Sequence, residues 1–181
     1  MKEQEIISGC KQHNANAQRC LFDQYYRRSF HIAFRYLANH HDTEDVLSIA
    51  FTKIFKNIHQ FENRGEGSFQ KWLNTVVINE AIRFLKSKKE LFFQEDQEYL
   101  TLNASLENGY DALDLEEVDQ ILENMPKGYR TVFNLFGIEG YSHKEIAKML
   151  HINENTSKSQ LSKARNYIIQ KLKKKNSHAL S

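Results

Sequence analysis

Small polar and basic side chains cluster between positions 155 and 165 of this 181-residue chain. Leu161, Ala164 and Ile168 recur at helical spacing, so we expect the other side of that helix to face away from the core. Such a helix fits the major groove of DNA, where amides and hydroxyls bond base edges and cations neutralise phosphates. The candidate groups are Asn155, Lys158, Ser159, Ser162, Lys163 and Arg165.

Two capping signals and a sharp turn would position this helix. Ser142 and Glu145 form an S-x-x-E capping box, which starts a preceding helix whose buried side is Ile146, Ala147 and Leu150. His151 stands where the chain must turn in the left-handed conformation, and Asn153 caps the second helix. The sequence therefore predicts a helix-turn-helix over residues 140–168.

Other chemistries find less support in the residues. His40, His41 and Asp42 with Asp45 suggest a metal-dependent hydrolase, but no further histidine cluster has ligand spacing. The Gly65-x-Gly67 pair is too short for a phosphate-binding loop. The two cysteines, at positions 10 and 20, lack a zinc-ligand pattern and are expected to be reduced and structural. We therefore predict no catalytic residue, cofactor, metal or small-molecule substrate.

The N-terminal half reads as an all-helical bundle over residues 15–89. One aromatic stripe, Phe22, Tyr26, Phe30 and Phe34, runs beside a second stripe of Leu21, Tyr25, Ala33 and Leu37. The residues 39–42 break this pattern, and a helix restarts near Leu47. A polar loop follows at 62–67, then a helix with Ser68 as its expected cap and Trp72 as an expected core residue.

The charge is unevenly distributed along the chain. Residues 90–120 hold ten acidic residues and no Lys or Arg, which leaves 13 acidic against 25 basic residues elsewhere. Residues 90–112 show little helical periodicity and are predicted to be an acidic linker. No run of apolar residues could span a bilayer or act as a signal peptide, so a cytoplasmic location is expected.

The C-terminal part, from residue 113, again reads as helical. One helix is predicted to end at Pro126, the next is predicted to be closed by Gly137, and two more follow at 143–150 and 154–172. The predicted fold class is all-α: two small helical domains, 1–89 and 113–181, joined by the linker 90–112, with the helix-turn-helix and a basic tail in the second.

The whole pattern resembles sigma factors of the extracytoplasmic-function (ECF) group, which are bacterial RNA polymerase subunits of the sigma-70 family. The resemblance covers about residues 15–173. In the first domain it lies in CLFDQYYRRSFHIAFRYL, DTEDVLSIAFTKIF and SFQKWLNTVVINEAIRFLK, and in the second in LENMPKGYRTVFNLFGIEGYSHKEIAKML and NTSKSQLSKAR.

The resemblance implies roles for matching residues of the first domain. Asp42, Glu44 and Asp45 would meet the β′ subunit of core RNA polymerase, although helix capping alone also explains them. The loop from Glu62 to Ser68 would capture a base flipped from the −10 promoter element. The residues implied around the −10 element are Arg64, Ser68, Asn79, Arg83 and Lys86. For Asn79, a structural hydrogen bond in a buried position is an equal alternative.

In the second domain, Lys158, Ser159, Ser162 and Lys163 match positions that read the −35 element in the family. Ser157 replaces a branched apolar residue, which should loosen the packing of that helix, and Gln160 replaces a common Arg and would suit adenine.

The implied partners are core RNA polymerase through its β′ and β subunits, promoter DNA, and an anti-sigma factor that is often membrane-anchored. Two alternatives stay open at this point: a stand-alone helix-turn-helix regulator and the metal-dependent hydrolase.

Overall fold

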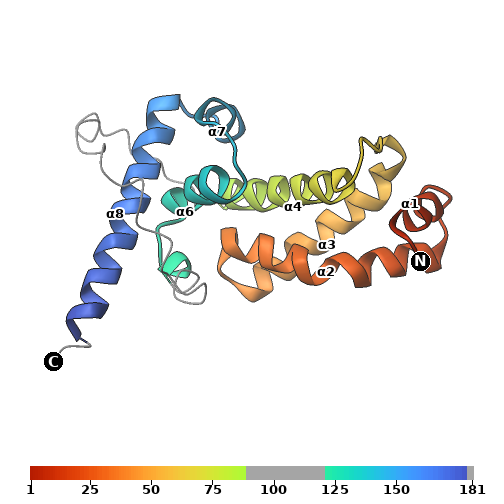
Figure 1. The fold of residues 1–181 in the computed structure, drawn as a ribbon, viewed down its shortest axis with the longest axis horizontal. Coiled ribbons are helices and arrows are strands. Elements are labelled where there is room, and N and C mark those ends of the chain that lie inside the picture. Colours follow the sequence, from red (N-terminus) through yellow and green to blue (C-terminus); the bar gives the residue numbers. More distant parts are fainter. Residues whose placement is uncertain (89–120, 179–181) are drawn as a thin grey trace. The chain divides into compact units, whose positions relative to one another are not determined.

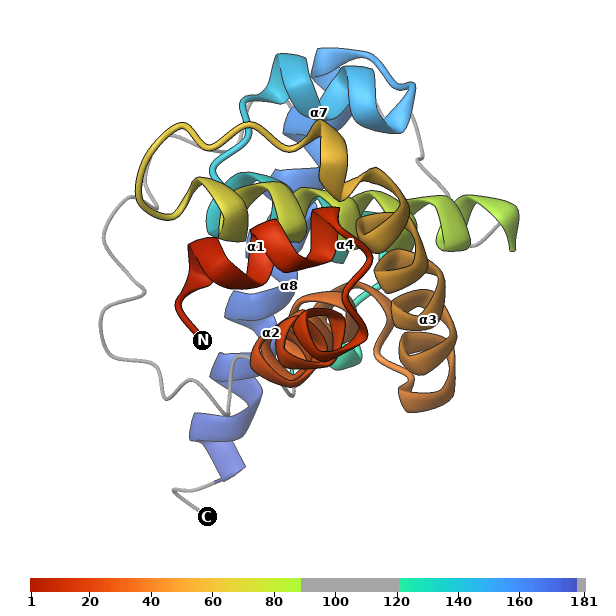
Figure 2. The ribbon, with the colours of Figure 1, turned by 90° about the vertical axis from the view of Figure 1, so that its right-hand side faces the viewer.

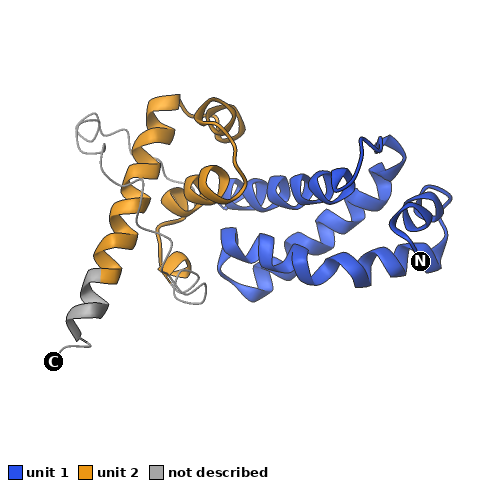
Figure 3. Ribbon diagram, in the orientation of Figure 1, with its two compact units in different colours: residues 1–88 blue, residues 89–181 orange. Residues whose placement is uncertain are grey.

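A computed structural model describes residues 1–88 and 121–178, with the side chains of 173–178 excluded. The chain divides into two compact units, residues 1–88 and 89–181 (Figure 1, Figure 3). Every element within the described ranges is a helix, which agrees with the predicted all-α class. The predicted linker at 90–112 and the start of the next predicted helix lie outside the described residues.

Unit 1 contains four α-helices and one short 3₁₀ turn. They are α1 (Glu3–Lys11), α2 (Ala15–Leu37), α3 (His40–Asn57), η1 (Ile58–Gln60) and α4 (Ser68–Ser87). Helices α2, α3 and α4 pack against one another, and α1 packs on α2 and η1 (Figure 2). Each helix buries one apolar face in a common core, as the 3.6-residue periodicity requires.

Helix α1 was not predicted, because the expected bundle began at residue 15. Ile6, Ile7 and Cys10 are its buried residues. Gly9 lets α1 approach α2 closely, since a Cβ at this position would lie 2.6 Å from the Cβ of Ala17. Burial raises the pKa of the Cys10 thiol, which makes it a weak nucleophile and fits the predicted structural role.

The two stripes of α2 differ in burial. Leu21, Tyr25, Ala33 and Leu37 are buried as predicted. The aromatic stripe lies at the edge of the core instead: Phe22 is 38% exposed, and its ring contacts the tilted ring of Phe51 on α3 at a centroid distance of 4.9 Å. The apolar face of α2 is thus narrower than predicted.

The break between α2 and α3 is shorter than predicted. It consists of Ala38, in the left-handed conformation with φ of 49°, and Asn39, whose side chain accepts the N–H of Asp42 as an N-cap. The helix then begins at His40, seven residues before the predicted restart. Asn39 is a strong cap, and it lets the polar residues that follow join the helix.

Unit 2 contains a helical turn at 121–123 followed by α6 (Lys127–Phe133), the π-helical turn η3 (Asn134–Ile138), α7 (His143–Leu150) and α8 (Glu154–His178). Its core includes Leu122, Met125, Ala164 and Ile168. The guanidinium of Arg130, which is 1% exposed, donates to the carbonyl oxygens of Leu122 and Glu123 and so caps the preceding helical turn from inside.

Gly137 does not close the second helix of this unit as predicted. The helix continues through Gly137 as the π-turn η3, and the left-handed position falls on Gly140, with φ of 75°. A glycine inside a helix and one after it look alike in sequence, because only the left-handed conformation distinguishes them.

None of the described helices combines the length and the apolar character that crossing a bilayer requires.

Candidate nucleic-acid interfaces

The loop before α4 is held in shape by its own polar groups. The Asn63 carboxamide oxygen accepts the N–H of Gly65 at 3.0 Å and the hydroxyl of Ser68 at 3.2 Å. The Ser68 hydroxyl oxygen in turn accepts the N–H of Arg64 at 3.2 Å. Ser68 therefore holds the loop closed through its hydroxyl and is the first residue of α4. The prediction that Ser68 is the helix cap is wrong, because Gly67 occupies the N-cap position and offers no side-chain hydrogen bond.

This loop and α4 border an open pocket with a volume of about 600 Å³. Its lining residues are Gln60, Phe61, Glu62, Arg64, Ser68, Lys71, Trp72 and Thr75. The Phe61 and Trp72 rings lie 5.6 Å apart between centroids and give the pocket an aromatic side. Trp72 is only partly buried and packs on the buried rings of Phe61 and Phe69, so it lies at the edge of the core rather than inside it. An indole face beside polar groups suits a planar base that stacks and forms hydrogen bonds.

Residues spaced three or four apart extend this surface along α4. Thr75, Asn79, Arg83 and Lys86 follow Trp72 at helical spacing and so share one face of the helix. Asn79 and Arg83 are exposed, so the alternative of a buried, structural Asn79 is wrong. Arg83 pairs loosely with Glu80 at 4.0 Å, and burial lowers the pKa of Lys86 from its usual value.

The three acidic residues of α3 have different surroundings. Glu44 and Asp45 are exposed, whereas Asp42 is partly buried and its carboxylate lies 3.3 Å from the ammonium group of Lys88. Asn39 takes the capping role that could have explained this cluster. Glu44 and Asp45 are therefore the members that are open to a partner.

The helix-turn-helix has the predicted local geometry. Ser142 and Glu145 form the capping box of α7, and His151 ends α7 in the left-handed conformation with φ of 57°. The Asn153 side chain accepts the N–H of Thr156 at 2.6 Å at the start of α8. The predicted inward residues of both helices are buried.

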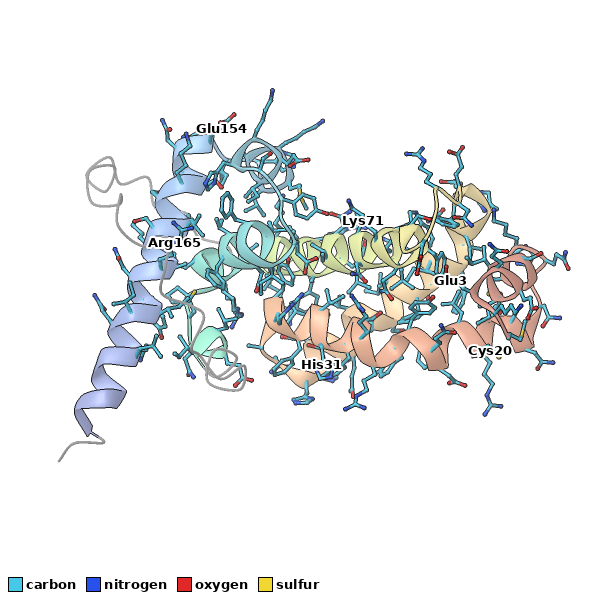
Figure 4. All side chains as sticks on the ribbon, in the orientation of Figure 1. Glu3, Cys20, His31, Lys71, Glu154 and Arg165 are labelled. Atoms are coloured by element: carbon cyan, nitrogen blue, oxygen red, sulfur yellow. The ribbon has the colours of Figure 1, made fainter. Side chains whose placement is uncertain are left out.

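Only part of the predicted DNA-facing side of α8 is exposed. Asn155 and Lys158 are exposed, and Arg165 is partly buried (Figure 4 shows Glu154 and Arg165 along this helix). Ser159, Ser162 and Lys163 are 5–8% exposed, so the prediction that they face solvent is wrong.

Two contacts hold the Lys163 and Ser159 side chains in these positions. The Lys163 ammonium group lies 5.9 Å from the centroid of the Tyr129 ring, because Lys163 projects from the flank of α8 that meets α6. Ser159 bonds back to the carbonyl oxygen of Thr156 in its own helix. Gln160 is also fully buried and so cannot meet a base edge in this arrangement.

Ser157 is fully buried and joins the two helices of the motif. Its hydroxyl lies 2.9 Å from Nδ1 of His143, whose ring stacks on Phe136 at 4.5 Å between centroids. The serine therefore has a specific polar partner where sequence comparison predicted loose packing. Burial, with Lys158 and Arg165 nearby, lowers the pKa of His143.

The histidines behind the hydrolase alternative do not converge. The His40 ring packs on Phe34 at 4.9 Å, whereas His41 lies on the exposed side with Nε2 3.9 Å from the Asp45 carboxylate. Within residues 1–88 and 121–178 no group of three or more His, Cys, Asp or Glu could hold a metal ion.

Several lining residues of the pocket were not among the predicted site residues. Lys71 and Thr75 lie one turn from Ser68 and Trp72, so helical spacing within α4 could have identified them. Gln60 precedes the loop, and its place at the pocket depends on the η1 turn, which no sequence signal indicated.

Comparisons with known proteins match both units. Residues 21–90 match the family model "Sigma-70 region 2", and residues 115–168 match "Sigma-70, region 4". The "ECF RNA polymerase sigma-E factor" of Haemophilus influenzae is 26% identical and covers 95% of this chain and 96% of its own length. The "ECF RNA polymerase sigma factor SigW" of Bacillus subtilis is 27% identical, covering 92% and 95%. A solved structure of the sigma factor RpoE of Bartonella quintana, in complex with the anti-sigma factor NepR, has a TM-score of 0.50 and 21% identity over 86% of this chain and 96% of that one.

Proposed function

Because the chain belongs to the ECF group of the sigma-70 family and is an RNA polymerase sigma factor that directs transcription initiation, we propose that unit 1 captures an unstacked −10 base and that α8 reads the −35 element. In this proposal the chain supplies binding energy and the polymerase supplies the chemistry. No residue of the chain is assigned a catalytic, cofactor or metal role. The proposed domains are 1–89 for −10 and polymerase binding, the linker 90–112, and 113–181 for −35 binding.

The observation that carries the −10 proposal is the pocket between the loop and α4. Extruding a base from the duplex costs a few kcal/mol, and stacking on an aromatic side chain returns roughly 1–3 kcal/mol per base. The partly buried Trp72 ring offers such a surface and is backed by the buried Phe61 ring, and Arg64, Ser68 and Thr75 surround it with hydrogen-bonding groups. Beyond the pocket, Asn79, Arg83 and Lys86 follow the same face of α4, where a strand leaving the pocket would meet amide and basic groups.

The −35 proposal rests on Asn155 and Lys158, which are exposed in the first turns of α8, and on the partly buried Arg165 further along the helix. Asn155 can bond a base edge, while Lys158 and Arg165 carry charge suited to phosphates. Ser159, Ser162 and Lys163 stay in the proposal as −35 residues, but they would have to become exposed before they could touch DNA. Asn155 and Lys158 therefore come first in any test.

Glu44 and Asp45 are proposed to dock on a basic surface of the β′ subunit, with Asp42 joining if it leaves Lys88. An anti-sigma factor is a further proposed partner, by analogy with the Bartonella quintana structure.

Co-elution with bacterial core RNA polymerase tests the docking part of the proposal. We expect the wild-type chain to co-elute on a sizing column and the Glu44→Gln, Asp45→Asn double variant to associate more weakly. The Glu5→Gln, Asp23→Asn double variant is the matched control, because it removes the same two charges from exposed positions on α1 and α2. Equal association of wild type and the α3 double variant would remove the docking role of α3.

A further inference from the structure

A polar contact joins the two helices of the helix-turn-helix at the turn of α8 that carries the exposed DNA-facing residues. Ser157 is 0% exposed, and its hydroxyl meets Nδ1 of His143, the first residue of α7, at 2.9 Å. The His143 ring is held in turn by stacking on Phe136, with an interplanar angle of 21°. The imidazole therefore has a fixed position from which it can orient the hydroxyl.

This polar contact lies beside buried apolar residues of the same two helices. Ile146, Leu150 and Leu161 are buried apolar residues, and the hydrophobic effect that stabilises their burial has no directional preference. A hydrogen bond between a stacked ring and a buried hydroxyl constrains both distance and angle. The bond thus fixes the rotation of α8 about its axis at Ser157.

The rotation at Ser157 matters because two exposed residues, Asn155 and Lys158, belong to the same turn of α8, although Thr156 between them is buried. A helix places each residue about 100° around its axis from the last. Lys158 and Arg165 lie close enough to His143 to depress its pKa. A shift of α8 at Ser157 would therefore move the groups that meet DNA.

We propose that the His143–Ser157 pair is a positioning device that sets the register of the DNA-reading turn of α8, and so determines how sharply the chain discriminates between −35 sequences. This inference rests on the proposed reading of −35 by α8. Neither residue touches DNA in this account: both act through Asn155 and Lys158. Base discrimination depends on hydrogen bonds that match the donor and acceptor pattern of a base edge, whereas attraction to phosphates is electrostatic and independent of sequence.

Thr and Val at position 157 give a matched pair of variants, because the two side chains have nearly the same shape and only Thr keeps the hydroxyl. His143→Phe keeps a ring that can stack on Phe136 and removes Nδ1. The full chain, bound to core RNA polymerase, is first used to select a preferred −35 duplex from a random-sequence pool. Affinities for that duplex and for a scrambled duplex are then measured for each variant, together with the thermal midpoint.

We expect Ser157→Val and His143→Phe each to lower the ratio of the two affinities by about 3- to 10-fold, the size of one lost hydrogen bond. Ser157→Thr should stay within about twofold of wild type, since it retains that bond. The double variant should lose no more than either single variant, and affinity for the scrambled duplex should not change.

Three results would overturn the proposal. Equal discrimination by the Val and Thr variants would show that the hydroxyl is irrelevant. If the variants lost affinity equally for both duplexes, in proportion to the fall in their thermal midpoints, the pair would only stabilise the fold. A wild-type chain that selects no duplex at all would contradict the −35 role itself, which is distinguishable from failure of the pair alone.

Discussion

Trp72 is the side chain on which the proposed stacking of a −10 base depends. Replacing Trp72 by Ala removes the stacking surface and should weaken binding of a single-stranded −10 oligonucleotide to the polymerase-bound chain by roughly 5- to 150-fold. Trp72→Phe is the control and should retain most of the affinity, because a smaller aromatic face remains. Fluorescence anisotropy of a labelled oligonucleotide measures the effect. Equal loss for both variants would argue against stacking.

Lys158 should act through phosphate attraction. Lys158→Ala is expected to reduce the slope of log affinity against log salt concentration by about 0.9 for duplex DNA, the loss of one phosphate contact. Lys56→Ala removes the same charge from an exposed position on α3 and serves as the control. Titrations at four or more salt concentrations give the slopes, and an unchanged slope for Lys158→Ala would remove that contact.

His143 should make the stability of unit 2 depend on pH. Its folded-state pKa is lowered below 6.5 by burial and by Lys158 and Arg165, with Glu154 acting in the opposite direction. The unfolded chain then binds more protons than the folded one, so stability is full above about pH 6.5 and falls as the pH drops through that value.

The measurement for His143 is amide hydrogen exchange of α7 and α8 at pH 7 and pH 5, corrected for the intrinsic rate. Wild type should lose more protection on acidification than His143→Phe, which cannot titrate. The opposite order would mean that protonation of His143 is favoured in the folded state.

At the scale of helices and turns, the sequence predicted structure correctly at positions where a residue satisfies a local requirement of the backbone, such as a helix cap. The capping box of Ser142, the left-handed His151 and the cap at Asn153 were predicted, because few alternatives satisfy those backbone groups. Helix α1 was missed, since its few buried residues become recognisable only when α2 is beside it.

The exposure of residues on α8 was predicted less well, because it also depends on neighbouring helices. Periodicity gives the direction of one packed face, but Lys163 is covered because α6 presents Tyr129 to a second flank. The pocket beside Trp72 likewise depends on how the loop closes on the Asn63 side chain, which accepts hydrogen bonds from the Gly65 backbone and the Ser68 hydroxyl. The hydrophobic periodicity of the sequence does not indicate these bonds.

The close approach of α1 to α2 gives a prediction about packing. Gly9→Ala places a methyl group against Ala17 and should destabilise unit 1 by about 1–3 kcal/mol, the range for overpacking. Gly137→Ala is the contrast: its Cβ would lie no closer than 3.9 Å to a neighbour, so stability should stay the same or rise by about 0.5–1 kcal/mol. Thermal and urea unfolding measure both, and a stable Gly9→Ala variant would contradict the packing.

At the scale of the whole molecule, the two units carry different parts of one function. Unit 1 has the pocket beside Trp72 and the exposed acidic residues of α3, while unit 2 has the helix-turn-helix, and each matches its own sigma-70 region. A stand-alone regulator needs only the second of these. The sigma factor account therefore requires that both units act in a single event, which is initiation by the polymerase at a promoter.

The most direct measurement is run-off transcription of genomic DNA from the source organism by its core RNA polymerase, with and without the chain, followed by sequencing of the 5′ ends. The account predicts new 5′ ends that appear only with the chain and share upstream −10 and −35 sequences. Trp72→Ala should lose these transcripts, whereas Lys56→Ala should keep them. A chain that binds DNA but creates no new 5′ ends would contradict the account and favour the stand-alone regulator.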